Sequence, residues 1–260
     1  MNDNATLVIN NDKDVSKVDI VFTIWSFAHP RTLQIFHNDN LIEEMTVPVD
    51  PIEVYLQDLS LTPGENVLCF RFPAGAEKAS SVTQGGDRRH LAAALSNFQI
   101  KIFRFNTPPS IEHPLMAHFG EKIKLLGYDV FLTKLESKLY LTFYWQTLGK
   151  IRENYTVFTH LTDENSLPLT QMDKQPVEGR YPTSEWVEGE IVKDDFTIDI
   201  PPDIPDGEYR VEVGMYLLET MQRLPVTGST EDVEAGRDYV LLDFTFRKEG
   251  DKITILPARG

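Results

Sequence analysis

Hydrophobic and polar residues alternate along most of the chain, which is the two-residue period of a strand with one buried face. The run "KVDIVFTIW" (17–25) places Val18, Ile20, Phe22 and Ile24 on one face. Further alternating runs follow, joined by short segments rich in Pro, Gly, Asn and Asp, such as "TPGEN" (62–66). Short strands with turns of this kind predict an all-β sandwich.

The segment "HLAAALSNFQIKIFRF" (90–105) allows two interpretations. Its Ala and Leu residues favour a helix. Apolar residues also alternate from Leu91 to Leu95 and again from Phe98 to Ile102, with one change of phase between the two runs. A β-bulge produces such a change of phase. We therefore predict a long bulged strand, with a short helical turn as the alternative.

The domain organisation follows from an interruption of this alternation. Residues 108–122 contain three prolines and no sustained period, so we predict a proline-rich linker there. The expected domains are an N-terminal β-sandwich at 1–107, of jelly-roll or galactose-binding-like type, and a C-terminal sandwich at 123–260. About seven strands are expected in the second half, a number typical of immunoglobulin-like or fibronectin-III-like domains.

The charge balance excludes some classes of partner. The chain has 25 Lys and Arg against 40 Asp and Glu, a formal charge of −15. A field of this sign repels phosphate backbones and anionic lipid surfaces, so we expect no nucleic-acid partner. No apolar run approaches the roughly 18 residues of a membrane helix, so we expect no membrane insertion by this chain.

Motifs for metal, cofactor or catalytic chemistry are missing from the sequence. The six histidines form no HxH or HExxH pair, and there is no glycine-rich phosphate loop and no GxSxG motif. The single cysteine, Cys69, lies within the apolar run "NVLCFRF" and is expected to be a buried, inert thiol. We predict no catalytic residue, no metal ligand and no cofactor.

Two groups of residues are candidates for ligand binding. In "GGDRRH", Asp87 and Arg88, with Arg89 and His90 after them, have the chemistry to read sugar hydroxyls or a partner's carboxylate. The competing interpretation is a turn whose arginines pair with an acidic surface, where ion pairs are common and weak.

The second group is "GRYPTSEWVEGE" (179–190). Tyr181 and Trp186 are candidates for stacking on a sugar, with Arg180 and Glu185 supplying hydrogen bonds. The competing interpretation is that both rings close the end of the sandwich core, since aromatic rings bury large areas. For Trp186 we expect partial burial, with one ring face toward solvent.

Residues 123–246 resemble a known β-sandwich module. The resemblance rests on "YWQ" (144–146), "YPTSEW" (181–186), "GE" (189–190) and "GEYRVEVGMY" (207–216). The region resembles the extracytoplasmic C-terminal part of bacterial membrane proteins similar to the protein-mannosyltransferase (family 39) glycosyltransferases. The first half is similar to a sandwich that accompanies such proteins. The resemblance implies an accessory region whose catalytic partner is a membrane domain, and it carries over no catalytic residue.

These observations lead to one preferred function and two alternatives. The preferred function is a non-catalytic accessory or binding module for a glycan or a protein surface, associated with a membrane glycosyltransferase. The alternatives are a structural spacer or oligomerisation domain, and a glycoside-active enzyme with two carboxylates in a cleft. We expect an extracytoplasmic location as part of a larger membrane protein. A cytoplasmic location is expected if this is the full chain, since the N-terminus lacks a signal peptide.

Overall fold

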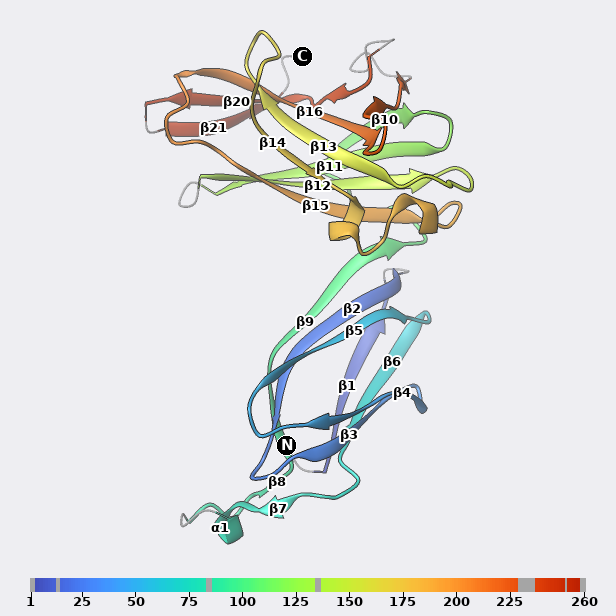
Figure 1. The fold of residues 1–260 in the computed structure, drawn as a ribbon, viewed down its shortest axis with the longest axis vertical. Coiled ribbons are helices and arrows are strands. Elements are labelled where there is room, and N and C mark those ends of the chain that lie inside the picture. The colour runs from blue at the N-terminus through green and yellow to red at the C-terminus, as the bar shows by residue number, and fades with distance from the viewer. Residues whose placement is uncertain are drawn as a thin grey trace. The chain divides into compact units, whose positions relative to one another are not determined.

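The computed structural model describes residues 3–12, 15–82, 86–133, 137–228, 237–250 and 252–257. The chain divides into two compact units, residues 1–104 and 105–260. Both are built almost entirely from antiparallel strands, so the all-β prediction is confirmed (Figure 1). Within the described ranges, no helix combines the length and apolar character that crossing a membrane would need.

The first unit is a two-layer sandwich. One layer has the strand order β1-β6-β3-β4, and β9, β2 and β5 lie side by side in the other (Figure 1). Phe22 of β2 and Phe70 of β6 meet edge to face in the core, with ring centroids 5.4 Å apart. The strands are β1 (Asn4–Asn11), β2 (Val15–Ser26), β3 (Arg31–His37), β4 (Asn40–Val47), β5 (Ile52–Ser60), β6 (Gly64–Arg71) and β9 (Ala93–Phe105).

Three short elements lie together at one end of this unit, namely β7 (Glu77–Lys78), α1 (Ala79–Val82) and β8 (His90–Leu91) (Figure 1). They precede β9, which forms most of the predicted strand and not the helical alternative, while His90 and Leu91 belong to β8. Asn97 has a left-handed φ of 52° at the predicted change of phase. A residue in this conformation shifts the side-chain alternation, and the apolar residues after it, Phe98, Ile100 and Ile102, are exposed.

The second unit is a sandwich of immunoglobulin type (Figure 1). One sheet has the order β18-β10-β11-β12-β15, and the other has the order β14-β13-β16-β20-β21 with β17 and β19 also pairing with β16. The chain passes from β12 in the first sheet to β13 in the second, where β14 pairs with β13. It then returns to the first sheet, where β15 pairs with β12. This exchange between sheets is the one found between the A-B-E and C′-C-F-G sheets of immunoglobulin-like domains. Tyr209 near the start of β16 donates from its hydroxyl to the Pro205 carbonyl oxygen at 2.6 Å, a tyrosine corner.

The bounds of these elements follow the alternation in the sequence. The strands are β10 (His113–Phe119), β11 (Ile123–Thr133), β12 (Lys138–Thr147), β13 (Tyr155–Thr162), β14 (Pro168–Lys174), β15 (Ile191–Asp199), β16 (Gly207–Leu217), β17 (Gln222–Arg223), β18 (Val226–Gly228), β19 (Val240–Leu241), β20 (Phe244–Glu249) and β21 (Lys252–Pro257). Two short 3-10 helices, η1 (Pro176–Gly179) and η2 (Thr183–Glu185), connect β14 to β15.

The predicted linker at 108–122 requires a correction. Residues 113–119 form strand β10, which pairs with β11 and β18. Leu115, Ala117 and Phe119 are buried, so this strand belongs to the core of the second unit. Pro114 lies where the β10–β11 register shifts, a position at which a strand tolerates proline. The strand was not recognised in the sequence because it buries only three alternating residues and lies in a proline-rich segment.

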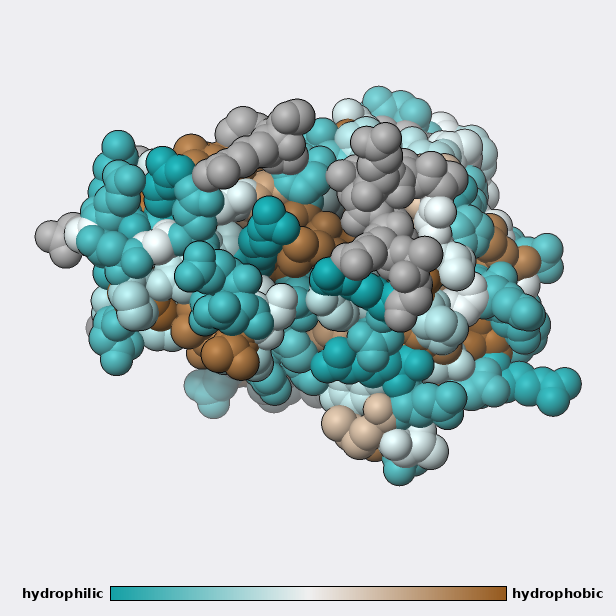
Figure 2. All heavy atoms as spheres, turned by 90° about the horizontal axis from the view of Figure 1, so that it is seen from above, coloured by the Kyte–Doolittle hydropathy of each residue, from teal (hydrophilic) through white to brown (hydrophobic). Residues whose placement is uncertain are grey.

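Most of the surface visible in Figure 2 is hydrophilic, and hydrophobic residues appear there as separate patches. This distribution is ordinary for a folded protein, because polar groups do not suffice to cover a whole surface. The exposed apolar residues therefore do not by themselves mark a functional site, and a concave region with a defined set of side chains is the better candidate.

Candidate functional site

A cavity of about 390 Å³ opens at the end of the first unit where β2 finishes and β8 and β9 begin. We call it the end pocket. Trp25 and Phe27 supply aromatic rings, and Arg89 supplies a charged group. The remaining lining residues are Ser26, Ala28, Val49, Leu91, Ala93 and Ala94. Ligand sites are commonly apolar cavities of about 300–1,000 Å³ with few polar groups, which is the composition found here.

The corner after β2 presents Phe27 to this pocket. The His29 amide donates to the Phe27 carbonyl oxygen at 2.8 Å, and Ala28 between them has a φ of 67°. This is a γ-turn of the positive-φ type, which is rare and strained. The Phe27 amide also donates to the Ala92 carbonyl oxygen at 2.8 Å, which ties the corner to the start of β9. Strain of this kind persists only where surrounding contacts hold it.

Buried Arg31 is the main contact that holds this corner. Its side chain is only 1% exposed, and its Nη2 lies 3.2 Å from a carboxylate oxygen of Glu77. Its Nη1 donates to the Phe27 carbonyl oxygen at 2.8 Å. The Ser26 hydroxyl donates to the His29 carbonyl oxygen at 2.6 Å. Because a buried charge must be paired and hydrogen-bonded, Arg31 fixes the corner in one geometry.

Arg89, which lines the end pocket, forms an exposed ion pair with Asp87. The Asp87 carboxylate accepts hydrogen bonds from the Arg89 backbone N–H at 3.0 Å, from Nε at 3.0 Å and from Nη2 at 2.7 Å. The side-chain hydrogen bond from Arg89, followed by its backbone N–H, lowers the pKa of Asp87 to about 2. The Arg89 side chain remains 75% exposed. The pair is therefore ionised, neutral overall and oriented by several bonds.

The structure thus assigns different roles to the predicted residues of "GGDRRH". Asp87 orients Arg89, and Arg89 is the residue that reaches the pocket. Arg88 is exposed and is not among the lining residues. Sequence reasoning included Arg89 in this group but missed Trp25 and Phe27. One signal was present, because Trp25 falls out of phase with the buried run that ends at Ile24 and so belongs to the opposite face.

Of the two interpretations of Tyr181 and Trp186, the structure supports rings that close the core and contradicts an exposed platform. Trp186 is 1% exposed and Tyr181 is 3% exposed, so neither ring offers a face to a sugar. The Trp186 Nε1 donates to the Tyr181 carbonyl oxygen at 3.1 Å, and the Tyr181 hydroxyl donates to the Glu185 carbonyl oxygen at 3.1 Å. The expected partial burial of Trp186 is corrected to full burial. Arg180 and Glu185 are exposed, but the buried rings of Tyr181 and Trp186 offer no surface beside them on which a sugar could stack.

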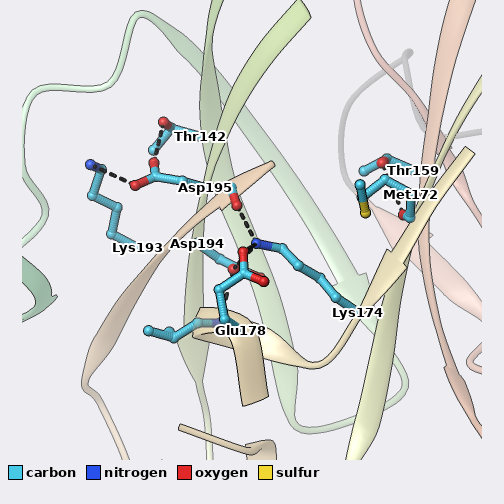
Figure 3. A network of polar contacts seen from close by, with 9 residues as sticks. Thr142, Thr159, Met172, Lys174, Glu178, Lys193, Asp194 and Asp195 are labelled. Atoms are coloured by element: carbon cyan, nitrogen blue, oxygen red, sulfur yellow. Dashed lines mark hydrogen bonds and ion pairs between the residues drawn. The ribbon is translucent and has the colours of Figure 1, made fainter. Parts of the chain in front are cut away.

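A buried carboxyl group, Asp194 on β15, is the most perturbed acid of the second unit. Burial raises its pKa to about 7, against the lowering effects of Lys174 and the Val177 N–H. Its Oδ1 accepts from the Val177 N–H at 3.0 Å and lies 3.8 Å from the Lys174 amine. Figure 3 shows the Lys174 amine pointing toward Asp194, the Glu178 carboxylate and the Asp195 carbonyl oxygen.

Perturbed carboxyl groups can mark active sites, but this one serves the local fold. Asp194 has no exposed surface for a substrate to reach. Its bond to Val177 holds a left-handed turn in which Val177 has a φ of 54° and Glu178 a φ of 57°. A β-branched residue in this region is strained, so the turn requires such an anchor.

Metal chemistry finds no support in the geometry. Among the residues that the structure describes, no group of three or more His, Cys, Asp or Glu side chains converges to hold a metal ion. The histidines and the single cysteine also lack the sequence spacing of known zinc sites.

No protein-family model and no curated protein matches the chain. Solved structures that it resembles include a β-glucuronidase from Bacteroides uniformis, at 10% identity over 86% of this chain and 25% of that one, with a TM-score of 0.25. A GH2 β-galacturonidase from Eisenbergiella tayi gives 12% identity over 97% and 37%, with a TM-score of 0.24. A β-D-mannosidase from Dictyoglomus thermophilum gives 13% over 86% and 29%, with a TM-score of 0.25. The chain spans between 25% and 37% of the length of these structures, and scores this low carry no argument about its activity.

Proposed function

We propose that this protein is a non-catalytic module that binds a glycan in the end pocket of its first unit. The observation that supports this most is the combination of two aromatic rings, Trp25 and Phe27, with the Asp87–Arg89 pair around one preformed cavity. Aromatic faces pack against the C–H faces of a sugar, and planar charged side chains hydrogen-bond its hydroxyls. The corner held by Arg31 keeps the pocket open before a ligand arrives, which lowers the entropic cost of binding.

The end pocket is poorly suited to hydrolysing a glycoside. Glycosidases require two carboxyl groups on either side of the scissile bond. The described residues that line the pocket include no Asp or Glu. The nearby Asp87 has a pKa of about 2, so it is a carboxylate at neutral pH and has no proton to give to a leaving group. These features favour binding without turnover.

A binding screen with one pocket variant tests the proposal. Wild-type protein is applied to a glycan array beside Trp25→Ala and a control variant, Phe131→Ala. Phe131 is an exposed aromatic residue of the second unit. We expect the wild type and the control to bind the same glycans and Trp25→Ala to lose that binding. Equal binding by all three proteins would contradict the assignment of the pocket.

The place of this module beside a membrane glycosyltransferase is also a proposal, supported by the resemblance of residues 123–246. In that setting the module would hold an acceptor or product glycan outside the cytoplasm while the membrane domain performs the transfer. The reading frame of the encoding gene is the direct test. We expect membrane spans to be encoded in the same or an adjacent frame, and their absence would remove this part of the proposal.

One observation favours oligomerisation as a second candidate function. On the outer face of the sheet β1-β6-β3-β4, Cys69, Phe36 and Leu41 stand side by side in a cross-strand row, with Val8 in the neighbouring row. Leu41 is 52% exposed and Val8 is 48% exposed. Contiguous exposed apolar residues of this kind mark contact surfaces. Light scattering of wild type and Leu41→Glu tests this candidate, which predicts a dimer only for the wild type.

A further inference from the structure

We infer that the end pocket holds a single neutral sugar ring and that the Asp87–Arg89 pair grips two adjacent hydroxyl groups of that ring. This inference rests on the proposed function, because it names the class of ligand that the same pocket takes. Size, lining, hydrogen-bonding capacity and charge each support it independently.

The size of the pocket limits the ligand. A volume of about 390 Å³ is near the lower end of the range for small-molecule sites, about 300–1,000 Å³. The corner at Phe27 and the start of β9 both line the pocket, and the hydrogen bond between the Phe27 amide and the Ala92 carbonyl oxygen joins them. A pocket of this volume accommodates one ring more readily than several consecutive rings of a chain.

The lining dictates where the polar groups of a ligand must lie. Trp25, Phe27 and Leu91 offer apolar surface, against which hydroxyl groups would be left unsatisfied. The Ser26 hydroxyl already donates to the His29 carbonyl oxygen at 2.6 Å. A sugar therefore packs a C–H face on the rings and directs its hydroxyls to the exposed Asp87–Arg89 pair.

The hydrogen-bonding capacity of this pair matches a vicinal diol. Arg89 uses Nε and Nη2 on Asp87, and no described residue accepts a hydrogen bond from its Nη1. The Asp87 oxygens accept from Arg89 but keep further lone pairs. One hydroxyl can therefore donate to Asp87 while its neighbour accepts from Nη1. A ring that lacks either hydroxyl forms one hydrogen bond fewer with the pair and is expected to bind more weakly.

The charge of the pocket favours a neutral ring over an anionic one. Asp87 neutralises Arg89 and, with a pKa of about 2, continues to do so at neutral pH. An incoming carboxylate at Nη1 would lie beside the negative charge of Asp87, which occupies the Nε and Nη2 groups of the same guanidinium. The formal charge of the whole chain, −15, also opposes the approach of anions. A uronic acid therefore meets repulsion where a neutral hexose meets matched hydrogen bonds.

The experiment is a titration of the full chain with the methyl glycosides of glucose, galactose and mannose and with the methyl glycosides of the corresponding uronic acids. Binding is followed by NMR shifts of the Trp25 indole N–H. The variants are Arg89→Lys, which keeps the charge but loses the planar fork, and Asp87→Asn. The control is Arg88→Lys, on the neighbouring exposed residue. Thermal melts establish that each variant is folded.

We expect at least one neutral glycoside to bind wild type and Arg88→Lys equally, and about tenfold more weakly to Arg89→Lys, as expected for the loss of one charge-assisted hydrogen bond. Asp87→Asn leaves Arg89 uncompensated, so we expect it to shift the preference of the pocket toward the uronic acid. A wild type that prefers the uronic acid, or Arg89→Lys with unchanged affinity, would overturn this inference and leave the proposed function standing. A wild type whose Trp25 signal responds to no sugar would overturn both.

Discussion

At the scale of single residues, burial decides which aromatic side chains can meet a ligand. Trp186 and Tyr181 lie in a stretch full of polar residues, yet both rings are enclosed and their polar atoms are hydrogen-bonded to backbone oxygens. Trp25 follows an apolar run, yet it borders a cavity. Local polarity left both interpretations of Tyr181 and Trp186 open and did not single out Trp25, because a ring is buried by distant segments and not by its neighbours in the sequence.

The burial of Trp186 predicts a large stability loss on truncation. Trp186→Ala removes a fully enclosed ring and a hydrogen bond, so we expect a loss of about 3–5 kcal/mol in the free energy of unfolding. Trp186→Phe keeps most of the volume and is expected to cost less. Denaturant melts of both variants measure this. A midpoint for Trp186→Ala equal to that of the wild type would contradict the enclosed position.

Asp194 predicts a specific dependence of stability on pH. Its pKa is about 7 in the folded protein against an ordinary value of 3.8, so folding favours the protonated form. The contribution is fully present below about pH 4 and is lost as the pH rises through about 7. Asp194→Asn mimics the protonated form. We therefore expect its stability relative to wild type to rise between pH 4 and pH 7, by about 1.4 kcal/mol per unit at most.

Urea melts at several pH values measure this difference, with Asp195→Asn as the matched control on the exposed neighbour. The charged groups around Asp194 are Lys174, Glu178 and Asp195, and Lys174 opposes the effect. Parallel pH profiles for wild type and Asp194→Asn would show that folding does not raise the pKa of Asp194.

At the scale of elements, close approaches between strands determine which small residues are required. Gly214 of β16 pairs with Phe158 of β13, and a Cβ atom at Gly214 would lie 2.2 Å from the Phe158 ring. The Asp238 carbonyl oxygen lies 2.9 Å from the same point. The Phe158 ring therefore packs directly on Gly214. No residue with a Cβ atom fits at this position of β16 unless the ring moves.

Gly214→Ala is accordingly expected to destabilise the second unit by about 1–3 kcal/mol or more, through overpacking. Gly207→Ala on the same strand is the control, since the nearest atom to its added Cβ lies at 3.6 Å, an ordinary contact. Thermal melts of both variants measure the difference. Equal melting temperatures would mean that Phe158 moves aside without cost.

At the scale of the whole molecule, the division between the two units lies at residues 104 and 105, before the proline-rich segment. Strand β10 supplies Leu115, Ala117 and Phe119 to the core of the second unit. It also covers one edge of β11, whose exposed backbone groups would otherwise invite aggregation.

Two fragments test this boundary. We expect residues 105–260 to unfold cooperatively, because the fragment keeps β10 and its buried side chains. Residues 123–260 lack that strand, so we expect this fragment to be less stable or to aggregate. Circular dichroism melts and light scattering measure the outcomes. Equal stability of the two fragments would restore the interpretation of 108–122 as a linker.

The sequence by itself determined the strands, because their two-residue alternation is a local property that survives in any β arrangement. The long strand through Asn97, the hairpin of β13 and β14 and the immunoglobulin-type second unit were all predictable from the alternation and turn residues of the chain. Tertiary structure alone decided the end pocket, because Trp25, Val49 and Arg89 come from separate segments that only sheet pairing brings together. Tertiary structure also decided the burial of Trp186 and the extent of β10. The burial of a residue depends on which strands pack against it and not on its neighbours in the sequence.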